Sequence, residues 1–336
     1  MADPMHPGAG RTTALAEPRA AAPARERGID SRADGSGPSE APEAVVFSHP
    51  VVLVDPRRVT LLAVQSLRQH GAPLHVVASR WMEPAFRARG VRRHRVPPLA
   101  TQPQGWSARL LELAAHLEPR GLLLPCSKPA RELLRRCRSM LEPHYELPFL
   151  EPLDVHDYEA EDFRTERALR RTVLRGEPAF EVQLTVDAAG TCTGCCVLTW
   201  VSASSPYVVV TSVEGSEVLE ASLDWLRPRG FRGYARLIWA PNRFGRVELQ
   251  AAGTLPGTGW ALAHDDGVDF PALWYASIAG VRTRPRQAQR RLSRQIPISE
   301  MARQSDVLPL VPFPIRWRLA DPLPWLMSVL SGLLQR

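Results

Sequence analysis

The basic residues of the sequence are almost all arginine. Lys128 is the only lysine among 42 basic residues, so a reaction that needs an ammonium group has one candidate for it. Three glycines of the segment GTLPGTG, namely Gly253, Gly257 and Gly259, have backbone N–H groups that can converge on an anion. The same composition is also typical of a plain loop, and a plain loop is what we expect there.

Three of the five cysteines lie close together in the sequence: Cys192, Cys195 and Cys196. The first two have the C-x-x-C spacing of a zinc half-site or of a redox pair. No second C-x-x-C and no H-x₃-H follows, and the surrounding residues alternate as in a strand. We therefore expect buried strand thiols, with zinc and redox chemistry as the alternatives.

A histidine and three aspartates that lie close together in the sequence offer another candidate metal site: His264, Asp265, Asp266 and Asp269. Because Pro271 follows and the pattern DFPALWYASIAG has helical spacing, these residues are more typical of a turn and an N-cap. We expect Asp269 to begin a helix over residues 269–280.

The elements that position these groups divide into two domains. Aliphatic runs at 51–55, 74–79 and 121–127 predict buried strands. Helical spacing follows them at 59–70, 106–117 and 129–141. This alternation predicts a three-layer α/β domain with a parallel, Rossmann-like sheet over residues 47–150. Ligands of such sheets bind at the carboxyl ends of the strands, here Asp55–Arg58, Ser79–Trp81 and Cys126–Lys128. The first strand is followed by DPRRVT and not by G-x-G-x-x-G, so dinucleotide binding is not expected.

Residues 151–281 have a different pattern, which predicts a smaller α+β domain with antiparallel hairpins. A charged helix is expected at 153–171, followed by a hairpin that turns at 187–190. A helix at 217–226 comes next. A second hairpin joins strands at 234–240 and 247–253. The helix at 269–280 closes the domain.

The two ends of the chain differ from the body in composition. Residues 1–46 contain almost no large apolar side chain, which predicts a disordered leader. Residues 282–336 are expected to form a basic linker and a C-terminal apolar helix. Residues 281–336 carry ten arginines and three acids, which account for the whole net charge of +7.

The six arginines that begin this tail could contact anionic lipid: Arg282, Arg284, Arg286, Arg290, Arg291 and Arg294. The alternative is a solvated connector to a docked helix. Nucleic acid is not expected, because no aromatic residues lie between the arginines. No secretory signal and no apolar run of spanning length is visible, and the five cysteines suit a reducing compartment. We expect a cytoplasmic protein, with the inner face of the membrane as a possible peripheral location.

The order of motifs resembles the carbamoyl-phosphate-synthase-like branch of the ATP-grasp superfamily, over about residues 50–280. The most specific pieces are GFRGYARLIW and GVDFPALWYASIAG. Enzymes of that branch join a carboxylate to an amine through an acyl phosphate. The resemblance therefore implies a site for ATP and Mg²⁺, whose metal ligands lie on strands similar to G-x-A-E-x-E-F and L-E-I-N-P-R.

The sequence departs from the family pattern at those ligand positions. Arg236 and Ile238 occupy the acidic positions of the first strand, and Ala251 and Gly253 occupy the Glu and Asn positions of the second. Glu248 is the only carboxylate nearby. Its odd offset from Ala251 predicts that it faces the other side of the strand.

The lysine- and glycine-containing lid of the family is also missing from the sequence. Its place, between the 153–171 helix and the first hairpin, is taken by RTVLRGEPAF. We therefore expect a degenerate, lidless ATP-grasp-like protein without ligase activity and without a cofactor. It would be a binding or accessory partner of a biosynthetic pathway, with an unidentified protein or small molecule as its own partner.

Two alternatives remain open from the sequence. The first is a working carboxylate–amine ligase with a rebuilt ATP and Mg²⁺ site, in which the phosphates lie against Arg236, Gly253, Gly257 and Gly259. The second is a peripheral membrane protein that attaches through its basic and apolar tail.

Overall fold

A computed structural model describes most of the two expected domains. The described residues are 47–57, 60–81, 83–151, 153, 155–157, 177, 179–204, 207–213, 215–242, 244–257, 259–287 and 293–297. The leader at 1–46 and the C-terminal helix expected within 282–336 lie outside them, as does most of the helix expected at 153–171. Where that helix was expected to begin, His156–Asp157 form a short strand, β6, because they pair with Ala251 and Ala252 of another strand.

The first domain contains the predicted parallel sheet, which has five strands in the order β3-β2-β1-β4-β5. All four pairings are parallel. The strands are β1 (Val51–Val54), β2 (Leu74–Ala78), β3 (Val91–Arg95), β4 (Gly121–Pro125) and β5 (Tyr145–Glu146). β1, β2 and β4 are fully buried, as their aliphatic composition predicts. β3 was not predicted, because it is an edge strand whose sequence, VRRHR, carries mostly exposed arginines.

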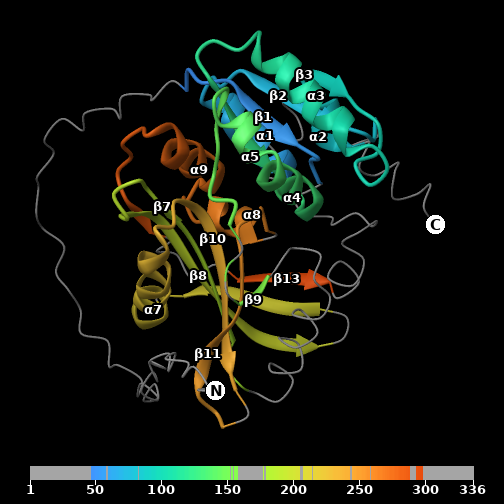
Figure 1. The fold of residues 1–336 in the computed structure, drawn as a ribbon. Helices are drawn as coiled ribbons and strands as arrows, with labels where there is room; N and C mark the ends of the chain where they lie inside the picture. The colour runs from blue at the N-terminus through green and yellow to red at the C-terminus, as the bar shows by residue number, and fades with distance from the viewer. Residues whose placement is uncertain are drawn as a thin grey trace, which may run out of the picture.

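Helices cover both faces of this sheet (Figure 1). They are α1 (Thr60–Gln69), α2 (Pro84–Arg87), α3 (Pro103–Ala114), α4 (Lys128–Arg136) and α5 (Arg138–Leu141). The helix expected at 129–141 is thus two helices that are separated at Cys137. α1 is buried over nearly its whole length, because a helix of the second domain covers the side that would otherwise face water.

The second domain is built on an eight-stranded sheet, ordered β13-β9-β8-β7-β10-β11-β6, with β12 beside β8. The predicted hairpins are present as β7 (Ala179–Val186) with β8 (Cys192–Ser204), and β10 (Gly233–Pro241) with β11 (Val247–Gly253). Besides β6, the strands of this sheet that were not predicted are β9 (Tyr207–Val213), β12 (Arg286–Gln287) and β13 (Ser293–Pro297). The predicted fold class, α/β with an additional α+β domain, is confirmed.

The two faces of the second sheet are covered differently. α7 (Ser216–Leu226), which continues into a 3₁₀ turn at Arg227–Arg229, packs on one face. α8 (Gly259–Asp265) and α9 (Phe270–Ala279) lie on the other face. Figure 1 shows α9 between the two sheets, where it contacts α1 as well as β7, β8 and β10. The side chain of Asp269 accepts a hydrogen bond from the backbone N–H of Ala272, which confirms it as the N-cap of α9.

Polar and aromatic contacts tie the two domains together at α9. The hydroxyl of Ser66, on α1, donates to Oδ1 of Asp269 over 2.6 Å, and Nε2 of His70 lies 3.4 Å from Oδ2. Phe47 stacks on the rings of both His70 and Tyr275. One apolar cluster also runs through both domains and includes residues of β1, β10 and α9. The seam between the domains therefore has the character of protein interior.

A histidine pair links β2 and β3 beneath α3. Nη2 of Arg109 lies 3.3 Å from Nδ1 of His94, whose Nε2 lies 3.0 Å from Nδ1 of His75. A guanidinium can only donate, so Nδ1 of His94 must accept and its proton lies on Nε2. His94 then donates to His75, which accepts only in its neutral form. Burial, His94 and Arg92 together lower the pKa of His75 to about 4.

The lowered pKa predicts a loss of stability in acid. Above the ordinary pKa of 6.5 the neutral pair is fully retained. As the pH falls from 6.5 towards 4, the unfolded chain binds a proton at this residue that the folded chain does not, so the free energy of unfolding decreases by about 3 kcal/mol. Urea unfolding at several pH values should show this slope, and His75→Phe should reduce it, leaving the smaller part that comes from the lowered pKa of His94. His116→Gln, at an exposed histidine of the same domain, should keep the wild-type slope. An equal slope in wild type and His75→Phe would contradict the assignment.

Candidate functional site

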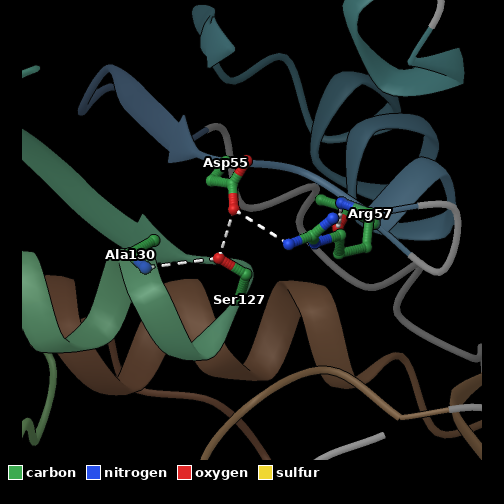
Figure 2. A network of polar contacts seen from close by, with 5 residues as sticks. Asp55, Arg57, Ser127 and Ala130 are labelled. Atoms are coloured by element: carbon green, nitrogen blue, oxygen red, sulfur yellow. Dashed lines mark hydrogen bonds and ion pairs between the residues drawn. The ribbon is translucent and has the colours of Figure 1, made fainter. Parts of the chain in front are cut away.

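The carboxyl edge of the parallel sheet carries a polar cluster at the ends of β1 and β4 (Figure 2). The hydroxyl of Ser127 donates to Oδ2 of Asp55 over 2.5 Å and accepts from the backbone N–H of Ala130 over 3.2 Å. Nη2 of Arg57 donates to the same carboxylate oxygen over 3.3 Å. Ser127 thus caps α4 and joins it to β1, and the Asp55 carboxylate has partners within the cluster.

This cluster occupies the place where open parallel sheets bind ligands. The chain leaves β1 in one direction to form β2 and β3, and returns on the other side of β1 as β4, so β1 and β4 flank the switch point. Asp55 has a φ of 52°, a left-handed conformation that a non-glycine residue rarely adopts. Lys128 follows Ser127 as the first residue of α4 and is exposed. Burial raises the pKa of nearby Cys126 to about 12, so this thiol is protonated at neutral pH.

The four positions at which the ATP-grasp resemblance implies metal ligands are direct neighbours in the second sheet. Arg236 pairs with Gly253, and Ile238 pairs with Ala251, across the β10–β11 ladder. Ile238 and Ala251 are fully buried in the apolar cluster that spans both domains. The four positions are therefore adjacent in space, but the side chains there are aliphatic or absent, apart from Arg236.

Arg236 is neutralised by a carboxylate of the adjacent strand β7. Its Nε donates to Oε1 of Glu181 over 2.6 Å and its Nη2 donates to Oε2 over 2.9 Å, and both side chains are only 2% exposed. Nε2 of Gln183 donates to Oε1 of Glu181 over 2.7 Å, and the hydroxyl of Tyr234 donates to Oε1 of Gln183 over 3.0 Å. These four residues, the buried polar cluster, form a continuous hydrogen-bonded chain. Burial raises the pKa of Tyr234 well above its ordinary value.

The glycines of the following segment fit closely over this cluster. A methyl group built at Gly257 would lie 3.0 Å from Nη1 of Arg236, and one at Gly259 would lie 1.7 Å from Nε2 of Gln183. Gly253 ends β11 and Gly259 begins α8, so the loop between them is shorter than the expected loop over the whole segment. The space that an anion would need beside Gly257 and Gly259 is occupied by the guanidinium and the amide of the protein itself.

The position of Glu248 differs from the one expected. Between β10 and β11 the register shifts, so that Ala240 pairs with Glu248 while Ile238 pairs with Ala251. This bulge adds one residue to β11 and cancels the odd offset, so Glu248 lies on the same face as Ala251. Oε1 of Glu248 accepts from Nδ2 of Asn242 over 2.8 Å, near the tip of the hairpin. The prediction that Glu248 faces the other side is wrong.

The residues present do not fit a Mg²⁺·ATP site. Mg²⁺ requires oxygen ligands in octahedral geometry, and the two strands offer Ile238, Ala251 and Gly253 at the implied positions. Within the described part of the chain, no three His, Cys, Asp or Glu side chains are grouped so that they could hold a metal ion. This also applies to the group around Asp269, whose carboxylate binds Ser66, His70 and the start of α9.

A small hollow lies at the seam between the domains. It measures about 200 Å³, open solvent included, and is lined by Pro125, Pro148, Phe149, Phe231, Arg232, Tyr234, Thr254 and Trp274. Ligand pockets usually enclose about 300–1,000 Å³. Beside it, Nη1 of Arg131 donates to the hydroxyl of Thr254 over 3.3 Å, which connects α4 to the end of β11. At this point the seam is largely filled by side chains.

The fold is that of the ATP-grasp enzymes, in a shortened form. The phosphoribosylaminoimidazole carboxylase ATPase subunit of Aquifex aeolicus is 12% identical, with a TM-score of 0.51 over 81% of this chain and 86% of that one. The glycinamide-RNase-transformylase T of Mycobacterium tuberculosis is 13% identical, with a TM-score of 0.53 over 74% and 84%. N5-carboxyaminoimidazole synthetase from Staphylococcus aureus, solved with ADP, is 7% identical, with a TM-score of 0.52 over 72% and 80%. No sequence-family model and no curated protein sequence matches the chain.

Sequence reasoning missed three residues of the buried polar cluster: Glu181, Gln183 and Tyr234. Glu181 and Gln183 alternate with apolar residues in FEVQLTV, and such alternation usually indicates a strand with one face in water. In the structure that face is covered by α8 and α9. A signal was nevertheless available, because Arg236 stands alone in an otherwise apolar strand and needs a buried carboxylate.

The ion pair predicts a marked non-additivity of mutations. Arg236→Met leaves the Glu181 carboxylate buried without its counter-ion, so we expect the free energy of unfolding to fall by about 3–5 kcal/mol. Glu181→Met should have a similar effect, because it strands the guanidinium. The double variant should lose clearly less than the sum of the two single losses. Urea unfolding of all four proteins measures this coupling, and additive losses would show that the two charges do not depend on each other.

The close approach of Gly259 to Gln183 predicts that a methyl group is not tolerated there. Gly259→Ala should displace the Gln183 amide and its hydrogen bond to Glu181, with a loss of about 1–3 kcal/mol in thermal or urea unfolding. The matched control is Gly105→Ala, inside α3, where the nearest atom of Pro97 lies at an ordinary 3.4 Å. This control should be neutral or stabilising, because alanine favours a helix. Equal effects of the two substitutions would refute the packing role of Gly259.

Proposed function

We propose that this protein is an ATP-grasp-fold chain without ligase activity, which acts by binding and serves a biosynthetic enzyme or pathway as an accessory partner. The observation that carries the proposal is the buried ion pair between Glu181 and Arg236, with Gly257 packed on the guanidinium. In a working site of this fold, the same place would have to admit phosphate and metal ions.

The energetics of the ion pair support the loss of nucleotide binding. For a phosphate to reach Arg236, it would have to displace a carboxylate that makes two short hydrogen bonds to the guanidinium. It would also leave the displaced Glu181 carboxylate buried beside the anion. Breaking a buried pair in this way costs about 3–5 kcal/mol, and like charges at close range add to that. A ligase with a rebuilt site at Arg236, Gly253, Gly257 and Gly259 would have to meet this cost.

The polar cluster of the first domain is the best-placed remaining surface for a small ligand. Asp55, Arg57 and Ser127 lie at the switch point of the sheet, and the exposed ammonium of Lys128 is adjacent in the chain. This cluster offers both signs of charge, so it suits a polar small molecule or a polar segment of a partner protein. The identity of that partner does not follow from the fold, because one fold supports many functions.

Association with an anionic membrane surface through the tail stays a prediction. Arg282, Arg284 and Arg286 are exposed, whereas Arg290 and Arg291 lie outside the described residues and Arg294 belongs to β13. None of the helices described has the length and apolar character needed to cross a membrane. The exposed arginines are equally suited to an acidic protein surface.

Calorimetric titration of Mg·ATP into the full chain tests the proposal. We expect no heat of binding above that of dilution, because the place for phosphate and metal is filled by Arg236 and Glu181. The N5-carboxyaminoimidazole synthetase from Staphylococcus aureus, which has been solved with ADP, serves as the positive control. Micromolar binding that EDTA abolishes would contradict the proposal. ATP-dependent release of ADP or AMP in the presence of a carboxylate and an amine would favour the ligase instead.

A further inference from the structure

The C-x-x-C segment has a local structure that its sequence alone did not predict. In a regular strand, residues three apart point to opposite faces. In β8, however, the register with β7 shifts: Gly194 pairs with Thr185 and Cys192 pairs with Val186, which leaves one extra residue in β8. The bulge cancels the odd spacing, so Cys192 and Cys195 lie on the same face of the sheet, packed in the apolar cluster beneath α7.

The two thiols lie on the same face of β8 and have unequal environments. A hydrogen bond from Cys195 lowers the pKa of Cys192, while the same contact together with burial raises the pKa of Cys195. Cys192 is half-buried and Cys195 is buried. The Cys192 thiol also lies 3.5 Å from the carbonyl oxygen of Gly194. Cys192 is therefore the more exposed thiol and the one with the lowered pKa, as an attacking sulfur requires, and Cys195 is placed to resolve the product.

We propose that Cys192 and Cys195 form a reversible thiol–disulfide site, which a hydroperoxide oxidises and a dithiol reduces. This inference is independent of the proposed function, because the site lies on the α7 face of the sheet while the buried polar cluster lies under α8. The remaining cysteines of the described residues are less suited to it: Cys126 and Cys196 are buried with raised pKa values, and Cys137 also has a raised pKa.

The chemistry proceeds in two balanced steps. The Cys192 thiolate attacks one oxygen of the hydroperoxide, the O–O bond breaks, and Cys192 becomes a sulfenic acid while water or an alcohol leaves with a proton. The Cys195 thiol then attacks that sulfur, the S–S bond forms, and the hydroxyl leaves as water with the Cys195 proton. Two thiols lose two electrons in total, and the hydroperoxide gains them. A dithiol reverses the result through a mixed disulfide.

The position of the bulge gives the disulfide a structural consequence. Gly194 and Cys195 pair with Arg286 and Gln287 of β12, at the start of the arginine-rich segment. A methyl group at Gly194 would lie only 2.2 Å from Cδ1 of Leu273, so the backbone of the bulge is packed tightly against α9. Closing a ring between Cys192 and Cys195 must reshape this backbone. The pairing with β12, which has only two residues, is the contact least able to resist the change.

Hydrogen peroxide treatment of the reduced full chain, followed by peptide mass mapping, tests the site. We expect one intramolecular disulfide between Cys192 and Cys195, with a loss of two hydrogen atoms in mass, which dithiothreitol restores. In the reduced protein, Cys192 should be alkylated several-fold faster than Cys137. Hydrogen exchange of the amides of Arg286 and Gln287 should be faster in the oxidised form.

Single-cysteine substitutions make the outcome decisive. Cys195→Ser removes the resolving thiol, so peroxide should leave a sulfenic acid at Cys192 that dimedone traps. Cys137→Ser, the matched control at a half-buried cysteine outside the pair, should form the disulfide like the wild type. Retention of all five free thiols in the wild type would overturn the proposal. So would a disulfide between other cysteines, or sulfinic acid at Cys192 with Cys195 still present.

Discussion

The buried ion pair between Arg236 and Glu181 constrains most of the second domain. A guanidinium and a carboxylate that are both 2% exposed need each other and further hydrogen-bond partners to persist in the interior. Gln183 and Tyr234 complete the hydrogen bonding from the strand side. Gly257 and Gly259 bring the backbone close enough to exclude water from the other side. The distance between the start of α8 and the sheet is therefore set by the size of the Gln183 amide and the Arg236 guanidinium beneath it.

The β10–β11 hairpin, where the ATP-grasp resemblance implies metal ligands, is stabilised by this ion pair and by apolar packing. The β10–β11 register aligns Arg236 with Gly253 and Ile238 with Ala251, so the scaffold that would present metal ligands is intact. Apolar packing stabilises these strands, because Ile238 and Ala251 belong to the core that joins the two domains. Similarity of fold at 7–13% identity speaks for the fold alone, because one fold supports many chemistries.

The elements with strong periodicity could be predicted from the sequence. The face to which a side chain points could not be predicted where one extra residue shifts the register of two strands. The buried strands β1, β2 and β4, both predicted hairpins and the N-cap Asp269 were all predictable, since aliphatic runs and capping chemistry are local signals. Bulges are not local, because they depend on the partner strand. One of them reversed the predicted facing of Glu248, and another brings Cys192 and Cys195 to the same face of β8. The partners of Arg236 were hidden for the same reason, since only the covering helices show that the face of Glu181 is buried.

The apolar cluster that runs through both domains has a consequence for how the protein comes apart. Val51 and Leu53 of the first sheet share this cluster with Ile238 and with Trp274 of α9. Neither sheet can lose its structure without exposing the side chains that shield the other. The two domains should therefore melt as one cooperative unit with a single calorimetric peak, and a protease should find no stable half-molecule to release.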